Sequence, residues 1–372
     1  MPRSAIVIGA GIAGLAIARA LAVRGYKVTV IERHQKSSGA SVRNFGMIWP
    51  VGQPDGHLFE TAMLSRRIWK QVCTEAGVWY DEAGALHLAH SAEEWNVLQE
   101  LAEKYSHRGY QLLNAAQAAA KSEAVVKNGL YGALYSADEM IVDPRKAIDR
   151  ISDWLSEKLG VYFYRGKAAT DVAYPAVYTG NDMYEADEIF ICTGSDFETL
   201  YPHLFAAAPL IKCKLQMMRM TAQPERWRMG PALCGGLSLA HYSSFKVADS
   251  LEILKKKFEQ EYPDYFRWGI HVMVSQNEEG ELSIGDSHEY GMAPDPFDRH
   301  CVNRLILEYL KKIAHFPDET ITETWNGIYP KLTNGESYWT AEPESGVRII
   351  GGLGGAGMTL SFGLCEKLIS NH

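Results

Sequence analysis

Three glycines and one carboxylate near the start of the chain have the residue types and the spacing needed to hold a dinucleotide. Gly9, Gly11 and Gly14 form a G-x-G-x-x-G pattern, and Glu32 follows Gly14 by eighteen residues. In this pattern the first glycine permits a tight turn, the second lets the backbone approach a pyrophosphate, and the third allows a helix to pack closely on a strand. The carboxylate accepts hydrogen bonds from a ribose diol. The motif therefore predicts a dinucleotide whose phosphates face the N-terminus of a helix.

A second glycine-rich turn lies near the end of the chain, at residues 351–359, with the sequence GGLGGAGMT. A predicted strand, residues 347–352, leads into it, and a predicted helix, residues 359–370, follows it. A nucleotide fold in one piece, as in a two-domain NAD dehydrogenase, leaves this second turn unexplained. A large ligand contacted from both ends of the chain favours FAD over NAD.

The elements that must position these motifs can be read from hydrophobic periodicity. Residues 5–8 and 27–32 are predicted strands with a helix at residues 12–24 between them, which is a βαβ unit of the doubly wound kind. Ser91 and Asp143 are predicted helix N-caps, with Pro144 at the first helical position. The predicted helices that follow are residues 57–77, 91–109 and 143–160, and the predicted strands are residues 78–90, 161–165 and 185–192.

The middle of the chain, residues 209–325, has a different pattern. Alternating stretches at residues 269–276 and 280–287 predict strands of a second sheet, and residues 297–315 predict one long helix. The sequence therefore predicts an α/β fold: a Rossmann-like FAD-binding domain of the glutathione-reductase type with an inserted α+β substrate domain on a mixed or antiparallel sheet. We expect residues 1–80, 143–208 and 326–372 to form the FAD-binding domain, and residues 81–142 and 209–325 to form the substrate-binding domain.

Composition narrows the class of partner. The net charge of −8 and the pI near 5.9 argue against a nucleic-acid partner, which normally meets a basic face. The six cysteines include no C-x-x-C pair, so neither zinc nor a disulfide framework is indicated. His87 and His90 fall in a predicted strand, where they point to opposite faces, so no metal is expected. The apolar run 5–18 resembles a signal peptide, but its glycines fit the nucleotide turn and it is too short to span a membrane. We expect a cytoplasmic protein without membrane insertion.

Residues 41–56, SVRNFGMIWPVGQPDG, follow the second strand and have no regular hydrophobic period, so they are predicted to be neither helix nor strand. Four elements of the sequence belong together: GAGIAGL with Glu32, the segment SVRNFGM, the strand end FICTGS and the turn GGLGGAGMT. Through these elements the chain resembles the D-amino acid oxidase superfamily of flavoproteins over essentially its whole length. The resemblance implies that these elements hold the ADP half, line the isoalloxazine, pass the pyrophosphate and direct a helix N-terminus at the flavin. The FAD-binding residues that it implies are Gly9, Ala10, Gly11, Ile12, Ala13, Gly14, Glu32, Arg33, Arg43, Asn44, Phe45, Gly46, Val172, Thr193, Gly194, Gly352, Leu353, Gly354, Gly355, Ala356, Gly357 and Met358.

The resemblance also implies a reaction: hydride transfer from the carbon next to an amine to flavin N5, giving an imine that hydrolyses. Negative charge then develops on the flavin, and a helix beginning near Gly357 would stabilise it. Positioning and desolvation do most of this catalysis. We therefore expect no dedicated acid or base residue, and the electron acceptor, oxygen or another, stays open.

Departures from the family pattern concern the substrate and the flavin linkage. Family members that act on amino acids show W-x-G-x-R-P, whose arginine binds the substrate carboxylate, whereas this chain has WNGIYP with Tyr329 in that place. Family members often carry a second arginine in the last glycine turn, and this chain has Gly355 at that position. The cysteine that links flavin in sarcosine oxidases is replaced by Gly327, and no histidine lies near Arg43. Non-covalent FAD is expected.

A narrower resemblance concerns a bacterial branch thought to oxidise aminophosphonates related to 2-aminoethylphosphonate. It rests on residues 41–56 together with GLSLAHYSSF and GDSHEYG. Donors for a phosphonate would come from Arg43, His241, Tyr242, Tyr329 and Lys331. The alternatives are an amino-acid oxidase or dehydrogenase of the glycine, sarcosine or D-amino acid type, a flavin-dependent hydroxylase with IGDS around Asp286 as its Gly-Asp motif, and an NAD-binding module without turnover.

Overall fold

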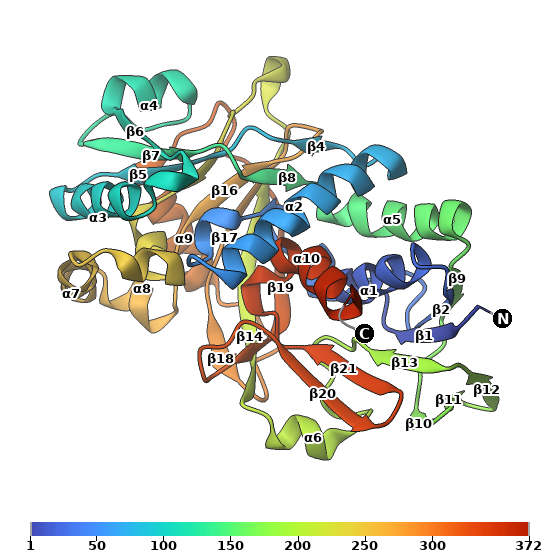
Figure 1. Cartoon of the computed structure of the whole chain (residues 1–372). Helices are drawn as coiled ribbons and strands as arrows, with labels where there is room; N and C mark the ends of the chain where they lie inside the picture. The colour runs from blue at the N-terminus through green and yellow to red at the C-terminus, as the bar shows by residue number, and fades with distance from the viewer. Residues whose placement is uncertain (1, 371–372) are drawn as a thin grey trace.

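The computed structural model describes residues 2–370, and its first layer is a six-stranded sheet (Figure 1). All neighbouring pairs in this sheet are parallel except β20 with β21. The strand order is β20 (Trp339–Glu344), β21 (Val347–Gly351), β13 (Glu188–Ile191), β1 (Ser4–Ile8), β2 (Lys27–Glu32) and β9 (Tyr162–Arg165). The predicted βαβ unit is confirmed, with α1 (Ile12–Ala22) between β1 and β2.

Both faces of this sheet are buried, as expected for parallel strands. Along β1, Ala5 and Val7 belong to the apolar core shared with the helices, while Ile6 and Ile8 belong to a separate core on the opposite face. Figure 1 shows the helices above the sheet and a small sheet below it. The helices are α1, α2 (His57–Ala76), α5 (Pro144–Leu159) and α10 (Gly357–Ser370), and the opposite face packs on β10 (Asp171–Ala173), β11 (Ala176–Thr179), β12 (Asp182–Glu185) and α6 (Pro202–Ala207).

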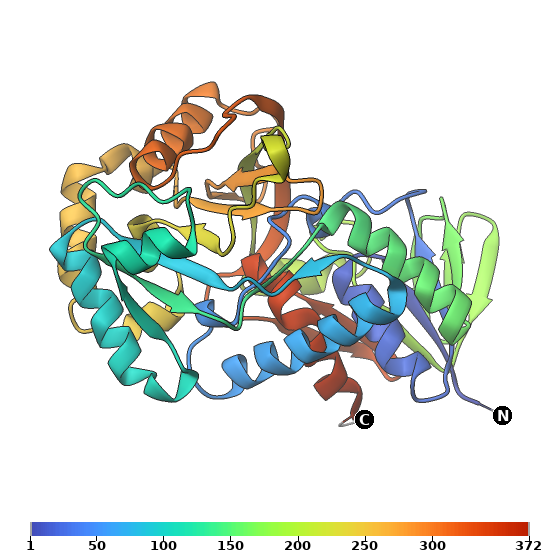
Figure 2. The same cartoon turned by 90° about the horizontal axis from the view of Figure 1, so that it is seen from above.

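A nine-stranded sheet forms the second layer system, beside the first in the view of Figure 2. Its strands are β18 (Glu289–Gly291), β14 (Leu210–Met220), β17 (Leu282–Gly285), β16 (Met273–Gln276), β15 (Ala232–Cys234), β5 (Ala85–Ala89), β7 (Gly132–Ser136) and β6 (Gln111–Asn114), with β19 (Ile321–Leu332) paired to β14. Its helices are α3 (Ala92–Lys104), α4 (Ala115–Lys121), α7 (Leu251–Glu261), α8 (Pro263–Arg267) and α9 (His300–Ile313). Most pairs are antiparallel and β15 with β5 is parallel, so the mixed sheet predicted for the middle of the chain is confirmed.

The predicted helix caps are confirmed in detail. The Ser91 side chain accepts a hydrogen bond from the Glu94 backbone N–H, and the Glu94 carboxylate accepts one from the Ser91 backbone N–H. Asp143 caps α5 by accepting from the Arg145 N–H at 3.0 Å. These bonds satisfy donors that the first helical turn leaves free.

Several predicted boundaries are wrong. Residues 41–56 contain a short strand, β3 (Met47–Ile48), which pairs with β8 (Met140–Val142), itself paired with β4 (Tyr80–Asp81); two residues are too few to show a period. Helix α3 ends at Lys104, and the residues up to Gly109 form a separate 3-10 turn. Residues 185–192 are divided between β12 and β13, and between them Asp187 accepts hydrogen bonds from Ser4.

The long strand β19 crosses the position, between residues 325 and 326, where the sequence places a domain boundary. It pairs with β14 from Leu210↔Leu332 to Met220↔Ile321. The predicted division into two domains stays a prediction, and β19 is the element that connects the two sheets most directly. Among the described residues, no helix has both the length and the apolar character needed to cross a membrane.

All six cysteines are free thiols, and five of them are buried. Cys301, on α9, is the exposed one. The absence of disulfides agrees with the spacing of the cysteines in the sequence.

Substitution of Gly14 by alanine is expected to lower the stability of the fold. An added Cβ would lie 1.9 Å from the Gly9 carbonyl oxygen, so α1 would have to move away from the strand. Such overpacking costs about 1–3 kcal/mol. Thermal unfolding of Gly14→Ala should show a lower Tm than wild type. Gly291→Ala, where an added Cβ meets nothing within 4 Å, is the matched control, and equal Tm values for the two variants would contradict this account of Gly14.

Candidate functional site

A first cavity, called the nucleotide cavity here, lies at the carboxyl ends of β1, β2 and β13. Ligands of open parallel sheets bind at this edge, where helix N-termini and loop residues converge. The cavity contains the first glycine motif, the end of β2, the start of the loop that follows it and the turn after β13. Its lining residues are Ile8, Gly9, Gly11, Ile31, Glu32, Arg33, His34, Ser37–Ser41, Ala169, Cys192–Asp196, Ile328 and Pro330.

The glycines of the first motif leave room that a side chain would fill. Gly9 has φ +102°, and a Cβ there would lie 2.4 Å from the Cys192 carbonyl oxygen. Gly11 is the N-cap of α1, and its missing Cβ would approach the Ser41 hydroxyl to 3.1 Å. Together with Gly14 against Gly9, these contacts give each glycine the steric role expected from the motif. The cradle is shaped for a dinucleotide.

Glu32 closes the nucleotide cavity with a buried carboxylate. One oxygen accepts a hydrogen bond from the Ala10 N–H at 2.8 Å, and the other accepts from the His34 N–H at 2.9 Å. Each oxygen keeps a lone pair for a hydroxyl donor, since a carboxylate offers about four acceptor sites. Arg33, beside it, forms an ion pair with Asp196 of the turn after β13. The donor set fits the ribose and phosphates of an ADP group.

A second cavity, called the flavin cavity here, adjoins the first, because Ala40 and Ser41 line both. It brings the second glycine turn together with the loop that follows β2 and with the second sheet. Its lining residues are Ile12, Ala40, Ser41, Arg43, Asn44, Phe45, Leu215, Met217, His241, Tyr242, His271, Asp286, His288, Gly327, Tyr329, Gly354, Gly355, Gly357 and Met358. Two adjoining cavities between the two glycine turns fit one elongated ligand with a nucleotide at one end and a ring system at the other.

A third cavity continues from the flavin cavity and is the candidate substrate entrance. The two share Asn44, Phe45, His241, Tyr242, Tyr329 and part of the glycine turn. Lys331, Lys246, Gly352, Leu353 and Ala356 are added here. A backbone bridge between Lys331 and Leu353 holds the end of β19 against the glycine turn.

The loop predicted to flank the flavin is ordered by its own side chains. Asn44 donates to the carbonyl oxygens of Ala40 and Ser41 and accepts from the Gly46 N–H at 2.7 Å. Arg43 lines the flavin cavity and donates to the Asn326 carbonyl oxygen at 2.9 Å. Asn44 therefore shapes the loop with its polar atoms while its side chain also borders the cavity.

Five of the residues predicted to bind FAD line none of these three cavities. Gly46 has φ +73°, and a Cβ there would lie 1.9 Å from the Val142 carbonyl oxygen, so its need for glycine comes from packing against β8. Val172 lies in β10, and Ala169, three residues earlier, lines the nucleotide cavity. The five are Ala10, Ala13, Gly14, Gly46 and Val172. Their contact with the cofactor stays a prediction.

Tyr329 and Gly355 face each other where family members with an amino-acid substrate carry arginines. A Cβ added at Gly355 would lie 3.6 Å from the Tyr329 hydroxyl oxygen. Tyr329 is buried, and burial raises its pKa well above the usual value, so the hydroxyl is neutral. Lys331 lies two residues further along β19, and its Nζ is 2.9 Å from the Tyr290 hydroxyl. Lys331 is therefore a cation close to Tyr329 in this wall, and Lys246 lines the same third cavity.

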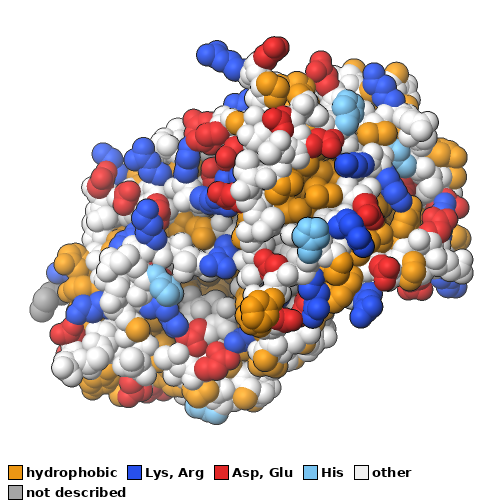
Figure 3. All heavy atoms as spheres, turned by 180° about the vertical axis from the view of Figure 1, so that it is seen from behind, with side chains coloured by type: hydrophobic (Ala, Val, Ile, Leu, Met, Phe, Trp, Pro, Cys, Tyr) orange, Lys and Arg blue, Asp and Glu red, His pale blue; other side chains and the backbone are white. Residues whose placement is uncertain are grey.

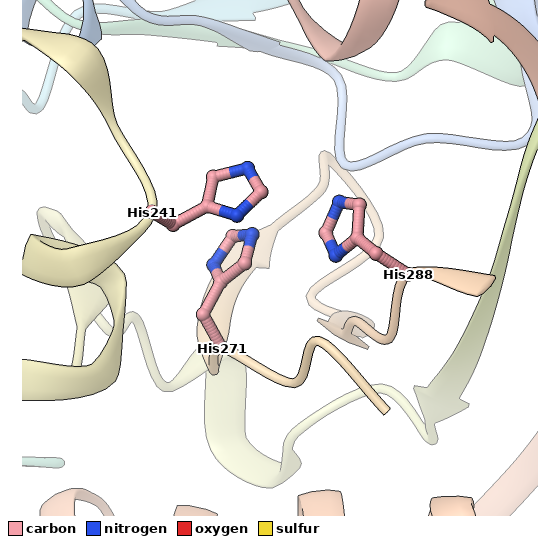
Figure 4. A group of neighbouring side chains, drawn as sticks. All are labelled: His241, His271 and His288. Atoms are coloured by element: carbon pink, nitrogen blue, oxygen red, sulfur yellow. The ribbon is translucent and has the colours of Figure 1, made fainter. Parts of the chain in front are cut away.

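Three histidines, called the histidine cluster here, lie together on the wall of the flavin cavity (Figure 4). Ring centroids of His241 and His271 are 4.0 Å apart, those of His241 and His288 are 4.5 Å apart, and those of His271 and His288 are 5.1 Å apart. His271 and His288 are buried, whereas His241 is exposed and lines the cavity. Among the described residues, the ring nitrogens of His241 have no hydrogen-bond partner.

Asp286 lies behind the histidine cluster with an unsatisfied oxygen. Its Oδ1 is 3.2 Å from His271 Nε2 and its Oδ2 is 3.8 Å from His288 Nε2, and no well-aligned hydrogen bond reaches the buried Oδ1 within the described chain. The other ring nitrogens are occupied: His271 Nδ1 lies 3.3 Å from the Ser238 hydroxyl, and His288 Nδ1 lies 2.9 Å from the Gly269 carbonyl oxygen.

Burial sets the protonation of this group. It lowers the pKa of His288 to about 4 and the pKa of His271 well below its usual value, and it raises the pKa of Asp286. The charge of Lys331 lowers the three histidine pKa values further. The imidazoles are therefore neutral near pH 7, because desolvation disfavours the charged form.

Sequence reasoning found His241 and missed His271, His288 and the role of Asp286. The pairing register of the two neighbouring strands would have revealed that His271 and Asp286 lie together. His271 and Asp286 exchange backbone hydrogen bonds of 3.2 and 2.8 Å just beyond the β16–β17 ladder. Pairing the two predicted strands as a hairpin would have placed them opposite each other.

The outer surface carries charges of both signs. In the face shown in Figure 3, lysine and arginine side chains are interspersed with aspartate and glutamate, and among the described residues of that face neither sign forms one continuous patch. This pattern agrees with a net charge of −8.

Glu32→Gln is expected to weaken retention of the nucleotide. A glutamine offers one carbonyl oxygen where the carboxylate serves two backbone N–H groups, so one buried donor is left unpaired at a cost of about 1–3 kcal/mol. The Kd for FAD, measured by the fluorescence of released flavin, should rise at least about fivefold. Glu157→Gln, on the exposed side of α5, is the control and should bind FAD as wild type does. An unchanged Kd in Glu32→Gln would argue against contact of Glu32 with the ADP group.

Solved structures similar to this chain share its fold over nearly the full length. Glycine oxidase from Bacillus cereus superposes with a TM-score of 0.75 at 18% identity, covering 99% of this chain and 95% of that one. L-proline dehydrogenase from P. horikoshii superposes with a TM-score of 0.75 at 19% identity, covering 100% and 94%. Identities this low establish the fold.

Curated relatives match over parts of the chain. The tRNA 5-methylaminomethyl-2-thiouridine biosynthesis bifunctional protein MnmC of Nitrosospira multiformis is 28% identical over 247 residues, which are 63% of this chain and 39% of that protein. The protein of the same name from Chromobacterium violaceum is 41% identical over 109 residues, 27% of this chain and 16% of that protein. These matches span less than half the length of either relative.

The sequence model of the family described as "DAO: FAD dependent oxidoreductase" matches residues 4–370. That range includes both glycine turns and every residue that lines the three cavities. The glycine cradle, the Glu32 carboxylate and the adjoining flavin cavity fit FAD on steric and hydrogen-bonding grounds. The chain belongs to the DAO family of FAD dependent oxidoreductases.

Proposed function

We propose that this protein is a FAD-dependent amine oxidoreductase that removes a hydride from the carbon next to a primary or secondary amine, giving an imine that hydrolyses to a carbonyl product. The observation that carries the proposal is the flavin cavity, where the second glycine turn meets neutral polar side chains of the second sheet. The names of the similar structures, glycine oxidase and L-proline dehydrogenase, support an amine as the group oxidised. FAD, when bound, supplies the hydride acceptor.

The residues of the chain would contribute position and electrostatics. The backbone N–H groups at the start of α10, beside Gly357 and Met358, border the flavin cavity, and a helix N-terminus stabilises negative charge. Phe45 and Met217 give the cavity apolar walls. Exclusion of water by these walls strengthens each polar contact inside.

The substrate is proposed to carry an anion other than a simple amino-acid carboxylate, namely a phosphonate related to 2-aminoethylphosphonate. Tyr329 and Gly355 stand where an arginine pair would bind a carboxylate, and Lys331 supplies a cation two residues away. Lys331, Tyr329, Tyr242 and His241 border the same entrance, so several donors are available to the three oxygens of a phosphonate. Arg43 is the further candidate from the flavin side.

The competing substrate class is an amino acid of the glycine, sarcosine or D-amino acid type, as the names of similar structures suggest. The name of the MnmC relatives contains a methylaminomethyl group, which is also an amine. It is therefore compatible with an amine as the group oxidised. The intermixed surface charges support a small molecule over tRNA. FAD is proposed to be held non-covalently. The predicted division into two domains would place the substrate between the two sheets.

A substrate panel tests the proposal. The holoenzyme is mixed anaerobically with glycine, sarcosine, D-alanine, 2-aminoethylphosphonate and N-methyl-2-aminoethylphosphonate, and bleaching of the flavin absorbance is recorded. Bleaching by the two phosphonates is the expected result. Bleaching by D-alanine alone would end the phosphonate proposal, and rapid NADPH consumption without bleaching by any amine would favour a hydroxylase.

Lys331→Met is expected to reduce kcat/KM for the preferred phosphonate. A hydrogen bond to a charged group contributes about 1.5–3 kcal/mol, so the loss should be about 10- to 150-fold. Lys158→Met, on the exposed side of α5, is the matched control and should keep wild-type kinetics. Equal kinetics for the two variants would remove Lys331 from the anion site.

Acid precipitation tests the flavin linkage. The flavin is expected in the supernatant, because Gly327 and the loop around Arg43 offer no cysteine or histidine for a bond. Flavin retained by the precipitated protein would refute the non-covalent proposal.

A further inference from the structure

The buried side chains of His271, His288 and Asp286 and the exposed side chain of His241 form a group that hydride transfer alone does not require. All four side chains line the flavin cavity. Asp286 is 5% exposed and has an oxygen without a well-aligned hydrogen bond. A buried polar atom without a partner is costly, so its retention beside the cavity calls for a function. The inference that follows rests on the proposed oxidation of an amine.

We propose that the histidine cluster is a proton-accepting site for the substrate's ammonium group, with His241 as the first acceptor and Asp286 as a positioning residue that stabilises the positive charge through His271 and His288. His241 is the ring that faces the cavity with both nitrogens free of described partners. His271 stacks against it at 4.0 Å between centroids and lies 3.2 Å from the carboxylate. The three ring nitrogens closest to one another lie within 4.8 Å.

The chemical need for such a site follows from the reaction. An aliphatic amine has a pKa near 10 and enters as an ammonium ion, which has no lone pair. Transfer of one N–H proton to a neutral imidazole leaves a neutral amine and an imidazolium. The freed lone pair becomes the new C=N bond as the α-hydrogen leaves with its bonding electrons for FAD. The products are an iminium, reduced cofactor and a protonated cluster, so charge and electrons balance.

The structure meets the two opposed demands on such an acceptor. The ring must be neutral before the substrate arrives. Burial keeps the pKa values of His271 and His288 low, and desolvation against these two rings together with the charge of Lys331 lowers that of His241. The imidazolium must then be stabilised. Burial raises the pKa of Asp286, and a proton on His271 or His288 would favour its ionised carboxylate, which would stand 3.2 Å from His271 Nε2 and 3.8 Å from His288 Nε2. A charge pair inside a cavity of low dielectric is far stronger than in water.

Other titratable groups around the cluster do not compete for this role. Tyr242 and Tyr329 are neutral because burial raises their pKa values well above the usual value. Lys331 is a cation that disfavours protonation of the rings, and its Nζ is paired with the Tyr290 hydroxyl. A substrate anion near Lys331 would offset that charge and favour proton uptake by His241. Binding of the anion and loss of the amine proton would thus support each other.

A metal ion is the other occupant that three histidines suggest. Tetrahedral zinc, with Zn–N distances of about 2.0–2.1 Å, holds its nitrogens about 3.3 Å apart. Here the three nitrogens lie within 4.8 Å of one another, and the ring pairs meet at interplanar angles of 17°, 33° and 39°, the first pair stacked and the other two tilted, so that the rings lie side by side. The arrangement favours proton exchange over ligation, and metal analysis is included in the test.

The pH dependence of kcat/KM tests the proposal with the best amine of the panel. Wild type should show a plateau between the low pKa of the cluster and the pKa of the free amine. His241→Gln should lose about 10²- to 10⁴-fold at pH 7, and its kcat/KM should rise tenfold per pH unit until the amine itself loses its proton. Asp286→Asn should shift the profile in the same direction. His203→Gln, an exposed histidine near α6, is the control and should keep the plateau.

Protonation of the bound amine gives a second measurement without turnover. The holoenzyme is loaded with ¹⁵N-labelled 2-amino-2-methylpropylphosphonate, which has no hydrogen on the carbon next to nitrogen, and the nitrogen chemical shift is followed. The ligand nitrogen in wild type is expected to reach the shift of a neutral amine at a lower pH than the ligand nitrogen in His241→Gln does. Folding of each variant is checked by Tm and bound flavin; if Asp286→Asn fails to fold, His241→Gln alone decides.

The outcomes separate this inference from the proposed function. Oxidation of no amine in the panel overturns the proposed function and the inference with it. Oxidation by wild type with an unchanged plateau in His241→Gln, or with the same nitrogen protonation in both proteins, overturns the inference alone. A stoichiometric metal ion in the purified holoenzyme that is lost in His241→Gln also overturns it, by assigning the rings as ligands.

Discussion

The lack of a side chain at Gly14, where a Cβ would lie 1.9 Å from the Gly9 carbonyl oxygen, is the constraint on which the rest of the structure depends. It sets how closely α1 packs on β1, and so where the free N–H groups of α1 point. Helix α1 in turn packs on α10 within one apolar core, and α10 carries the second glycine turn at its N-terminus. One backbone approach thus positions motifs that are some 340 residues apart in the sequence.

The second sheet brings chemistry to the cavity through strand ends. Tyr329 and Lys331 come from β19, which pairs with β14 along most of its length, and His271 and Asp286 come from the open end of the β16–β17 hairpin. Backbone hydrogen bonds therefore fix the spacing of the polar groups, and side-chain packing only tunes it. Strand pairing thus helps to hold His271 and Asp286 in place although burial disfavours their charged forms.

Local sequence signals predicted the nucleotide half of the fold well. The G-x-G-x-x-G motif, Glu32 and the helix caps Ser91 and Asp143 each act through residues within a few positions, so spacing alone reveals them. The histidine cluster depends on register between strands and on a 3-10 turn, which spacing does not encode. The strand at Met47–Ile48 was not predicted, because it has only two residues and its partner, β8, lies more than ninety residues away. The family resemblance places Gly46 beside the flavin, which stays a prediction; its need for glycine comes from the Val142 carbonyl oxygen, and only the folded chain shows that.

The distribution of the cysteines allows thiol labelling to report how this protein unfolds. Cys301 alone is exposed, while burial raises the pKa of Cys73 and of Cys192 to about 12. Because the thiolate is the reactive form, a thiol reagent should modify one site on the native protein and reach the others only as layers separate. Cys192 and Cys365 lie with the nucleotide turn, and Cys234 lies in the second sheet. The order in which thiols are labelled during unfolding would therefore record which layer comes apart first.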